Sequence, residues 1–256
     1  MPLANLREIR ERIEKERKAE KKQERSNTYK GEKFKGHYQG YEDPEFVLAI
    51  GHSPKTSNAY TKDGISEYYF NKEIIEKTVV ELEVRGIKWG ILERENGTSG
   101  LDFEFVNKNF QNVKIIELHN NTGGGDGGIE ALKGKQKRDN NFGETMIQEI
   151  SKTTGLRLRG LKEIENGNGA GFMNKLPNVV NSLIELGFFD NEKDLEKLRK
   201  NNNYNVMLGI LNGYLVSEGK ERVSELKAYD KNGKLKENIR VPKQQKEEKI
   251  RQNYVK

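Results

Sequence analysis

The chain has 256 residues, of which 33% are apolar and 34% are charged. This length allows one domain with a sizeable core, and the modest apolar share places part of the chain outside that core. The chain contains no cysteine, which excludes disulfides and thiolate metal ligands, so any metal must be held by His, Asp or Glu. No apolar run approaches the roughly 20 residues that span a bilayer.

The net charge of +6 is concentrated at the two ends of the chain. Residues 1–36 carry a net +5 and residues 219–256 a net +6, whereas residues 37–218 carry −5. Basic ends favour polyanions such as nucleic acid, anionic lipid or anionic wall polymers, but mixed-charge tails are also commonly just solvated. The first 25 residues lack the apolar core of a signal peptide.

Residues 3–25 have the pattern of a charged helix with a thin apolar stripe, and residues 26–44 are polar, rich in Gly and Tyr, and typical of a linker or an arm on the domain. After them, short apolar runs alternate with segments of helical spacing. The expected strands are 46–50, 87–94, 113–119, 128–134 and 179–189, and the expected helices are 65–85, 99–110, 142–155, 191–201 and 204–218.

Strands that alternate with helices predict an α/β fold, with a mostly parallel, twisted sheet flanked by helices. We divide the chain into a charged N-terminal helix and linker (residues 1–44), a central domain (residues 45–218) and a basic C-terminal tail (residues 219–256). The tail contains Asn232-Gly233, a pair typical of a hairpin turn.

Two of the three histidines, His52 and His119, come directly after or at the end of expected buried strands. In an open α/β sheet, ligands bind outside the carboxyl ends of the strands, so these imidazoles could share one ion. A catalytic zinc ion takes three protein ligands and keeps a position for water. Glu67, at the start of the next helix, is a candidate third ligand, and Asp63 in the preceding loop is its rival.

Glu185 lies inside an apolar run, where a carboxylate is costly unless it is paired or belongs to a site. A hydrolytic metal site needs a base that takes a proton from water, and Glu185 is a candidate for it. A buried ion pair with Arg159 is the alternative, and a histidine at a strand end is often only a satisfied polar residue. The residues alone therefore indicate a metallohydrolase-like site without naming a substrate.

Several short motifs also occur in a fixed order. They are AIGH (49–52), GISEYYFN (64–71), IIELHNN (115–121), GGIE (127–130), RGLK (159–162), LP (176–177) and LIELGFFDN (183–191). Together they resemble the zinc-dependent N-acetylmuramoyl-L-alanine amidases of the Amidase_3 type, whose second histidine lies in Ser-Ile-His-Ala-Asn. The chain departs from that pattern at Ser53-Pro54, where glycines are frequent, and at Asn120, where a small residue is usual.

The resemblance implies that His52, Glu67 and His119 bind Zn²⁺ and that Glu185 is the catalytic carboxylate. It implies cleavage of the amide between N-acetylmuramic acid and L-alanine in peptidoglycan by a catalytic domain spanning residues 45–218. Arg159, Lys162 and Asn121 are expected to contact the substrate, although Arg159 and Lys162 could instead pair with surface glutamates.

Two other functions stay open, namely another zinc peptidase of the cell wall on a similar frame, and a non-catalytic wall-binding module whose basic tails bind anionic wall polymers. No nucleic-acid partner is expected. We expect the protein to act on the cell wall as a phage or prophage endolysin released by lysis, as part of a phage-like particle, or as an autolysin whose signal peptide is missing from this sequence.

Overall fold

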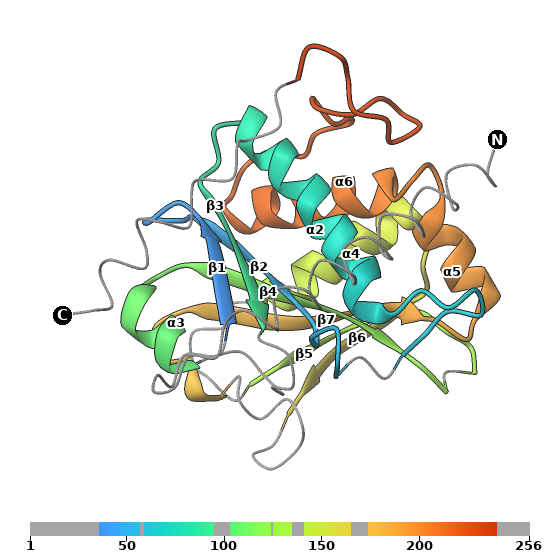
Figure 1. The fold of residues 1–256 in the computed structure, drawn as a ribbon, viewed down its shortest axis with the longest axis horizontal. Helices are drawn as coiled ribbons and strands as arrows, with labels where there is room; N and C mark the ends of the chain where they lie inside the picture. The colour runs from blue at the N-terminus through green and yellow to red at the C-terminus, as the bar shows by residue number, and fades with distance from the viewer. Residues whose placement is uncertain are drawn as a thin grey trace, which may run out of the picture. The chain divides into compact units, whose positions relative to one another are not determined.

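A computed structural model describes most of the chain from residue 36 onwards, and the predicted N-terminal helix lies outside this part. The described residues are 36–56, 59–94, 103–123, 125–134, 141–164 and 174–239. They form one seven-stranded sheet with helices packed on both faces (Figure 1). The predicted α/β class is thereby confirmed.

The sheet contains seven strands that are numbered in chain order. They are β1 (Gly36–Gly40), β2 (Phe46–Ile50), β3 (Trp89–Arg94), β4 (Lys114–Asn121), β5 (Ile129–Lys133), β6 (Leu158–Glu163) and β7 (Val180–Phe188). The helices are α2 (Glu67–Val84), α3 (Phe103–Asn109), α4 (Phe142–Thr154), α5 (Glu192–Arg199) and α6 (Tyr204–Ser217).

The strand order is β1-β3-β2-β4-β7-β5-β6. The four neighbouring strands β3, β2, β4 and β7 run parallel to one another. β1 is antiparallel to β3, β5 is antiparallel to β7, and β6 is parallel to β5. The sheet is therefore mostly parallel, as predicted, but mixed at both margins. The carboxyl ends of β2, β4 and β7 meet at one edge, where ligands bind in such sheets.

Two strands were not predicted. β1 falls in the segment that we expected to be a linker or an arm, and its sequence GHYQG has no run of apolar side chains. β6 is the outermost strand on the other side of the sheet, and its residues are exposed or only partly buried. In sequence, neither strand shows the regular apolar alternation that marks a half-buried strand.

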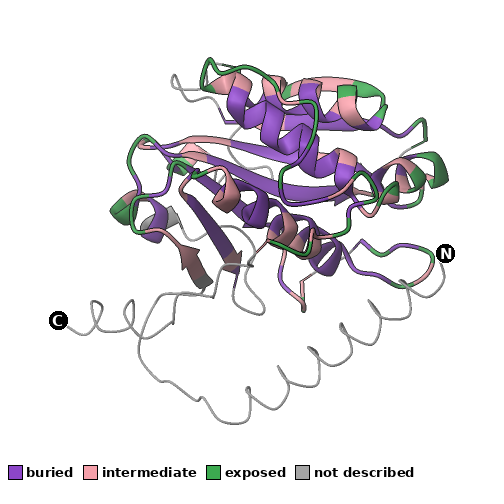
Figure 2. Ribbon diagram, turned by 90° about the horizontal axis from the view of Figure 1, so that it is seen from above, coloured by how far each residue is buried: buried purple, intermediate pink, exposed green. Residues whose placement is uncertain are grey.

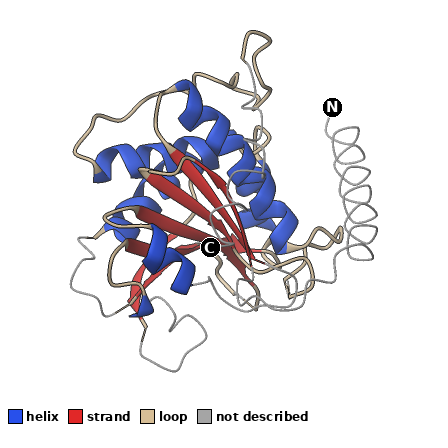
Figure 3. Ribbon diagram, turned by 60° about the vertical axis from the view of Figure 1, so that its left-hand side comes forward, coloured by secondary structure: helices blue, strands red, loops and turns tan. Residues whose placement is uncertain are grey.

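The central strands of the sheet are buried, as the colours of Figure 2 show, and helices lie against the sheet in Figure 3. All five residues of β2 are buried, which explains its uninterrupted apolar sequence. One face packs against α3 through a cluster that includes Val47, Phe105 and Ile115. On the opposite side of the molecule α2, α4 and α6 pack together, and the Tyr214 ring of α6 stacks on Phe46 of β2 with centroids 4.8 Å apart.

Helix α6 is buried along most of its length and approaches α4 closely. A Cβ atom on Gly209 would lie 2.5 Å from the Cα atom of Ile150, so this crossing requires glycine. Among the described residues, no helix is both long and apolar enough to cross a membrane.

The segment after α6 is attached to the domain by buried carboxylates. Glu81 of α2 accepts hydrogen bonds from the backbone N–H groups of Lys227 and Ala228 at 2.9 and 2.7 Å. Arg222 pairs with Glu149 of α4 at 2.7 Å. An antiparallel bridge between Tyr229 and Leu235 closes the turn expected at Asn232-Gly233.

Candidate metal centre

Three residues from different elements converge at the carboxyl edge of the sheet. His52 follows β2, His119 lies near the end of β4, and Glu67 is the first residue of α2. One ligand atom from each lies within 4.8 Å of the other two. Glu67 Oε2 is 3.3 Å from His52 Nε2, and Glu67 Oε1 is 3.0 Å from His119 Nδ1. The carboxylate therefore lies between the two imidazoles.

Backbone geometry directs His52 into this cluster. His52 has a φ of 62°, a left-handed conformation that residues other than glycine adopt rarely and that often marks a functional site. The preceding residue, Gly51, donates its N–H to Leu118 O at 2.9 Å. A Cβ atom on Gly51 would lie 2.2 Å from that oxygen and 2.8 Å from His119 Nε2. Only glycine allows the two strand ends to approach this closely.

Glu67 is buried, with 2% of its surface exposed, and it is held by the backbone on both sides. Its N–H donates to Ala59 O at 2.9 Å, and its Oε1 accepts from the Asn120 N–H at 2.8 Å. One turn further along α2, Asn71 donates to Leu118 O at 3.0 Å. The start of α2 is thus fastened to β4, and the helix N-terminus favours a negative charge at this position.

These residues fit a zinc ion. Two imidazoles and one carboxylate are a frequent ligand set of catalytic zinc. Ligand atoms about 2.0–2.1 Å from a tetrahedral zinc ion lie about 3.4 Å from one another, close to the distances from Glu67 to the two rings. Burial lowers the pKa of His52, although Glu67 opposes this effect, and a neutral imidazole is the form that binds metal.

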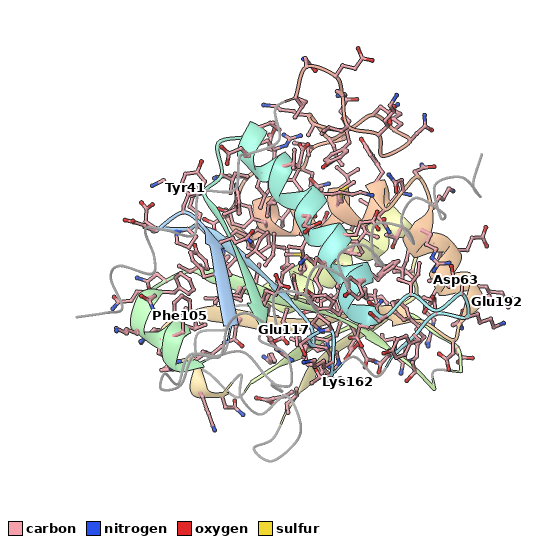
Figure 4. The ribbon with its side chains drawn as sticks, in the orientation of Figure 1. Tyr41, Asp63, Phe105, Glu117, Lys162 and Glu192 are labelled. Carbon is pink, nitrogen blue, oxygen red and sulfur yellow. The ribbon has the colours of Figure 1, made fainter. Side chains whose placement is uncertain are left out.

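Asp63, the rival third ligand, lies elsewhere. It is on the loop before α2, close to α5 (Figure 4), and its Oδ1 accepts hydrogen bonds from Arg199 at 2.9 Å and from Thr61 at 2.5 Å. Its pKa is lowered because these hydrogen bonds outweigh the effect of burial. The structure brings Glu67, and not Asp63, to the two histidines.

Glu185 lies on β7 directly beside His119 in the parallel register. Burial raises the pKa of Glu185 to about 7; Glu67 and Glu130 add to this effect, and His119 opposes it. Its Oε2 atom is buried and has no hydrogen-bond partner among the described residues. The carboxyl group is therefore able to exchange a proton near neutral pH.

The three residues expected to contact substrate all converge on Glu130 of β5, which lies opposite Glu185 in the antiparallel register. Glu130 Oε2 is 2.6 Å from Arg159 Nε and 2.8 Å from Lys162 Nζ, and Glu130 Oε1 is 3.3 Å from Asn121 Nδ2. These cations lower the pKa of Glu130 against the effect of burial. The ion pair of Arg159 is thus with Glu130, rather than with Glu185 or a surface glutamate.

Two carboxylates at this edge, Glu130 and Glu117, were not identified as site residues from the sequence. Glu117 of β4 is buried and lies 2.8 Å from His119 Nε2, and it forms an ion pair with the buried Arg94 of β3. Burial lowers the pKa of Arg94 to about 10, so the guanidinium stays charged at neutral pH. Glu117 interrupts an apolar strand just as Glu185 does, and this pattern would have identified it.

Comparison with known families supports the motif resemblance. The sequence profile of Amidase_3, described as N-acetylmuramoyl-L-alanine amidase, matches residues 46–214. No curated protein sequence matches the chain significantly.

Several solved structures share the fold at low sequence identity. An N-acetylmuramoyl-L-alanine amidase from Clostridium difficile 630 superposes with a TM-score of 0.56 at 18% identity, covering 70% of this chain and 99% of that chain. The amidase AmiC2 of Nostoc punctiforme gives 0.56 at 16% identity, with the same coverage of 70% and 99%. The catalytic domain of the CD27L endolysin targeting Clostridia difficile gives 0.54 at 24% identity, covering 67% of this chain and 96% of that chain.

Proposed function

This chain belongs to the Amidase_3 family of N-acetylmuramoyl-L-alanine amidases, and from that premise we propose that it cleaves peptidoglycan with a zinc ion held by His52, Glu67 and His119. The bond cleaved is the amide between the lactyl group of N-acetylmuramic acid and L-alanine. The observation that carries the zinc proposal is the convergence of these three ligand atoms beside Glu185.

When bound, zinc would supply Lewis acidity, which polarises a carbonyl group and makes water more acidic. We assign the proton transfers to Glu185. Its carboxylate takes a proton from the attacking water as the new carbon–oxygen bond forms, and it returns that proton to the amide nitrogen as the carbon–nitrogen bond breaks. A group with a pKa near 7 suits both steps, because it is neither too weak a base nor too weak an acid.

The Glu130 cluster (Glu130, Asn121, Arg159 and Lys162) lies next to the proposed base, and we propose that it positions the substrate. Lys162 is half exposed and Arg159 is partly exposed, so both have surface available to an acidic group. A carboxylate of the stem peptide or an acidic group of the glycan matches their charge. Arg159→Gln and Lys162→Gln are expected to raise KM more than they lower kcat, and an unchanged KM in both variants would contradict this role.

The chemistry is tested by incubating the purified protein with purified cell walls and identifying the new end groups. An amidase releases the N-terminal amine of L-alanine, whereas a carboxypeptidase or endopeptidase leaves the lactyl amide intact. Release should stop with a strong chelator, return with zinc, and be lost in Glu185→Gln. The exposed Glu192, which pairs with Lys62 outside the cluster, provides the control Glu192→Gln.

Full activity in chelator, or in Glu185→Gln, would contradict the mechanism. A protein that binds walls and releases no end group would be the non-catalytic wall-binding module instead.

We also propose that the basic ends of the chain bind anionic wall polymers electrostatically, as the net charges of +5 and +6 suggest. Such binding weakens as salt rises, because the Debye length falls to about 8 Å at physiological ionic strength. Retention on walls that does not depend on salt would contradict this. Release as a phage or prophage endolysin stays a prediction.

A further inference from the structure

Behind His119, buried polar side chains form a line that leads away from the metal centre. Glu117 lies on β4 two residues before His119, and its Oε1 is 2.8 Å from His119 Nε2. The same oxygen contacts Arg94 at the end of β3. Glu117, Arg94 and His119 are 2%, 6% and 8% exposed, so water screens these contacts very little.

Strand β2 lies between β3 and β4, so the Arg94 side chain must cross it to reach Glu117. The register places Ala49 of β2 beside both Leu92 and Glu117. On this face, β2 therefore presents the methyl group of Ala49 and then Gly51, which has no side chain. These small residues leave room for the Arg94 guanidinium to cross β2 and pair with the carboxylate of Glu117.

The two ring nitrogens of His119 have different partners. Nδ1 faces Glu67, on the side of the proposed metal, and Nε2 faces Glu117. A carboxylate accepts a hydrogen bond from a ring N–H, so Glu117 favours the tautomer with the proton on Nε2 and the lone pair on Nδ1. A hydrogen bond of this kind also fixes the ring plane and makes the ligand nitrogen more basic.

We propose that Glu117, held by Arg94, is a positioning residue that orients His119 for the metal and strengthens its binding. The inference rests on the proposed zinc centre. The motif that residues 117–121 resemble, Ser-Ile-His-Ala-Asn, has serine in place of Glu117, so this charged support distinguishes the present chain from the pattern. Serine is shorter and uncharged, and it does not supply a carboxylate to the ring.

A buried ion pair with a purely structural role is the competing interpretation, and zinc affinity separates the two. Zinc dissociation constants of the purified full-length protein and its variants would be measured by competition with a chromophoric chelator. We expect Glu117→Gln and Glu117→Ser to bind zinc about 10- to 100-fold more weakly, the range found when such hydrogen-bond partners are removed. Absorption bands of bound Co²⁺ should shift in the same variants, because the ligand ring moves.

Glu81→Gln is the matched control, because Glu81 is also buried and pairs with an arginine, Arg85, at 2.5 Å. Glu81 lies fourteen residues along α2 from Glu67, about 21 Å at 1.5 Å per residue. Its loss should reduce stability and leave the zinc affinity and the Co²⁺ spectrum unchanged.

Glu117→Gln removes the carboxylate that pairs with the buried Arg94 charge, so this variant is at risk of unfolding. The double variant Arg94→Met/Glu117→Leu removes both charges and replaces them with apolar groups, which proteins often tolerate. A folded double variant with wild-type zinc affinity would overturn the inference, and one with 10- to 100-fold weaker binding would support it. Wild-type protein that binds no zinc would contradict the metal centre itself, and the inference with it.

Discussion

The close contact at Gly51 gives a sharp prediction for Gly51→Ala. The new methyl carbon would lie 2.2 Å from Leu118 O and 2.8 Å from His119 Nε2, whereas ordinary contacts begin at 3.4 Å. The His119 ring must therefore retreat by at least about 0.6 Å, which is the difference between 3.4 and 2.8 Å. A metal site tolerates displacements of only about 0.5 Å, so we expect zinc affinity to fall at least about tenfold.

The same substitution should reduce stability. The strand ends must separate, which removes the hydrogen bond from Gly51 N to Leu118 O. That loss costs about 1 kcal/mol and overpacking about 1–3 kcal/mol, so the free energy of unfolding should fall by about 2–4 kcal/mol. Urea unfolding of the metal-free protein measures this loss in the free energy of unfolding, and chelator competition measures the zinc affinity.

Gly209→Ala is the matched control, because its methyl carbon would lie 2.5 Å from Ile150 Cα in the α4–α6 contact, away from the ligands. It should also destabilise the protein, by about 1–3 kcal/mol, but bind zinc normally. The reasoning is refuted if Gly51→Ala keeps wild-type zinc affinity, or if Gly209→Ala weakens zinc as strongly.

Three further predictions concern individual carboxylates. Glu67→Gln should lose zinc binding and Asp63→Asn should keep it, as calorimetric titration would show; equal losses would mean that Asp63 approaches the metal. The pH–rate profile should show an acid limb, because activity is lost as the base Glu185 is protonated. The pKa of Glu185 is about 7 without a cation and lower once a cation is bound, so the midpoint of this limb should lie at or below pH 7. A limb above pH 8 would argue against Glu185. Arg222 and Lys152 lower the pKa of Glu149 in the folded state, so its stabilising effect is present above the unfolded value of 4.5 and is lost as pH falls through the folded pKa. The stability difference between wild type and Glu149→Gln should accordingly shrink between pH 7 and pH 3 in urea unfolding, and a constant difference would show that the charge of Glu149 is not involved.

The central sheet was predictable because its strands are buried on both faces. β2 is a continuous apolar run that leads into Gly51-His52, and β4 is a buried strand that contains His119. A segment of helical spacing lies between them in the sequence. Strands β1 and β6 were missed because they lie at the margins, where backbone pairing supplies the order and side chains need not be apolar. Pairing of that kind depends on distant segments and leaves no local periodicity.

The site was predictable to the extent that topology places strand ends together. That principle pointed to His52 and His119, but it did not separate Glu67 from Asp63, because both lie within the same loop and helix start. In the structure, Asp63 is held away from the two histidines by its ion pair with Arg199, which lies far along the chain. The direction of β5 was likewise not predicted, and with it the convergence of Arg159 and Lys162 on Glu130.

The attachment of residues 222–228 to α2 and α4 affects how this protein can be shortened or recombined with other modules. The family match ends at residue 214, yet Glu81 finds two of its hydrogen-bond donors at Lys227 and Ala228. A fragment cut at the end of the match would lose these two hydrogen bonds to Glu81 and the last turn of α6, so we expect it to be less stable than the full chain. A fusion to another module is therefore best made beyond Leu235, so that the bridge between Leu235 and Tyr229 is kept.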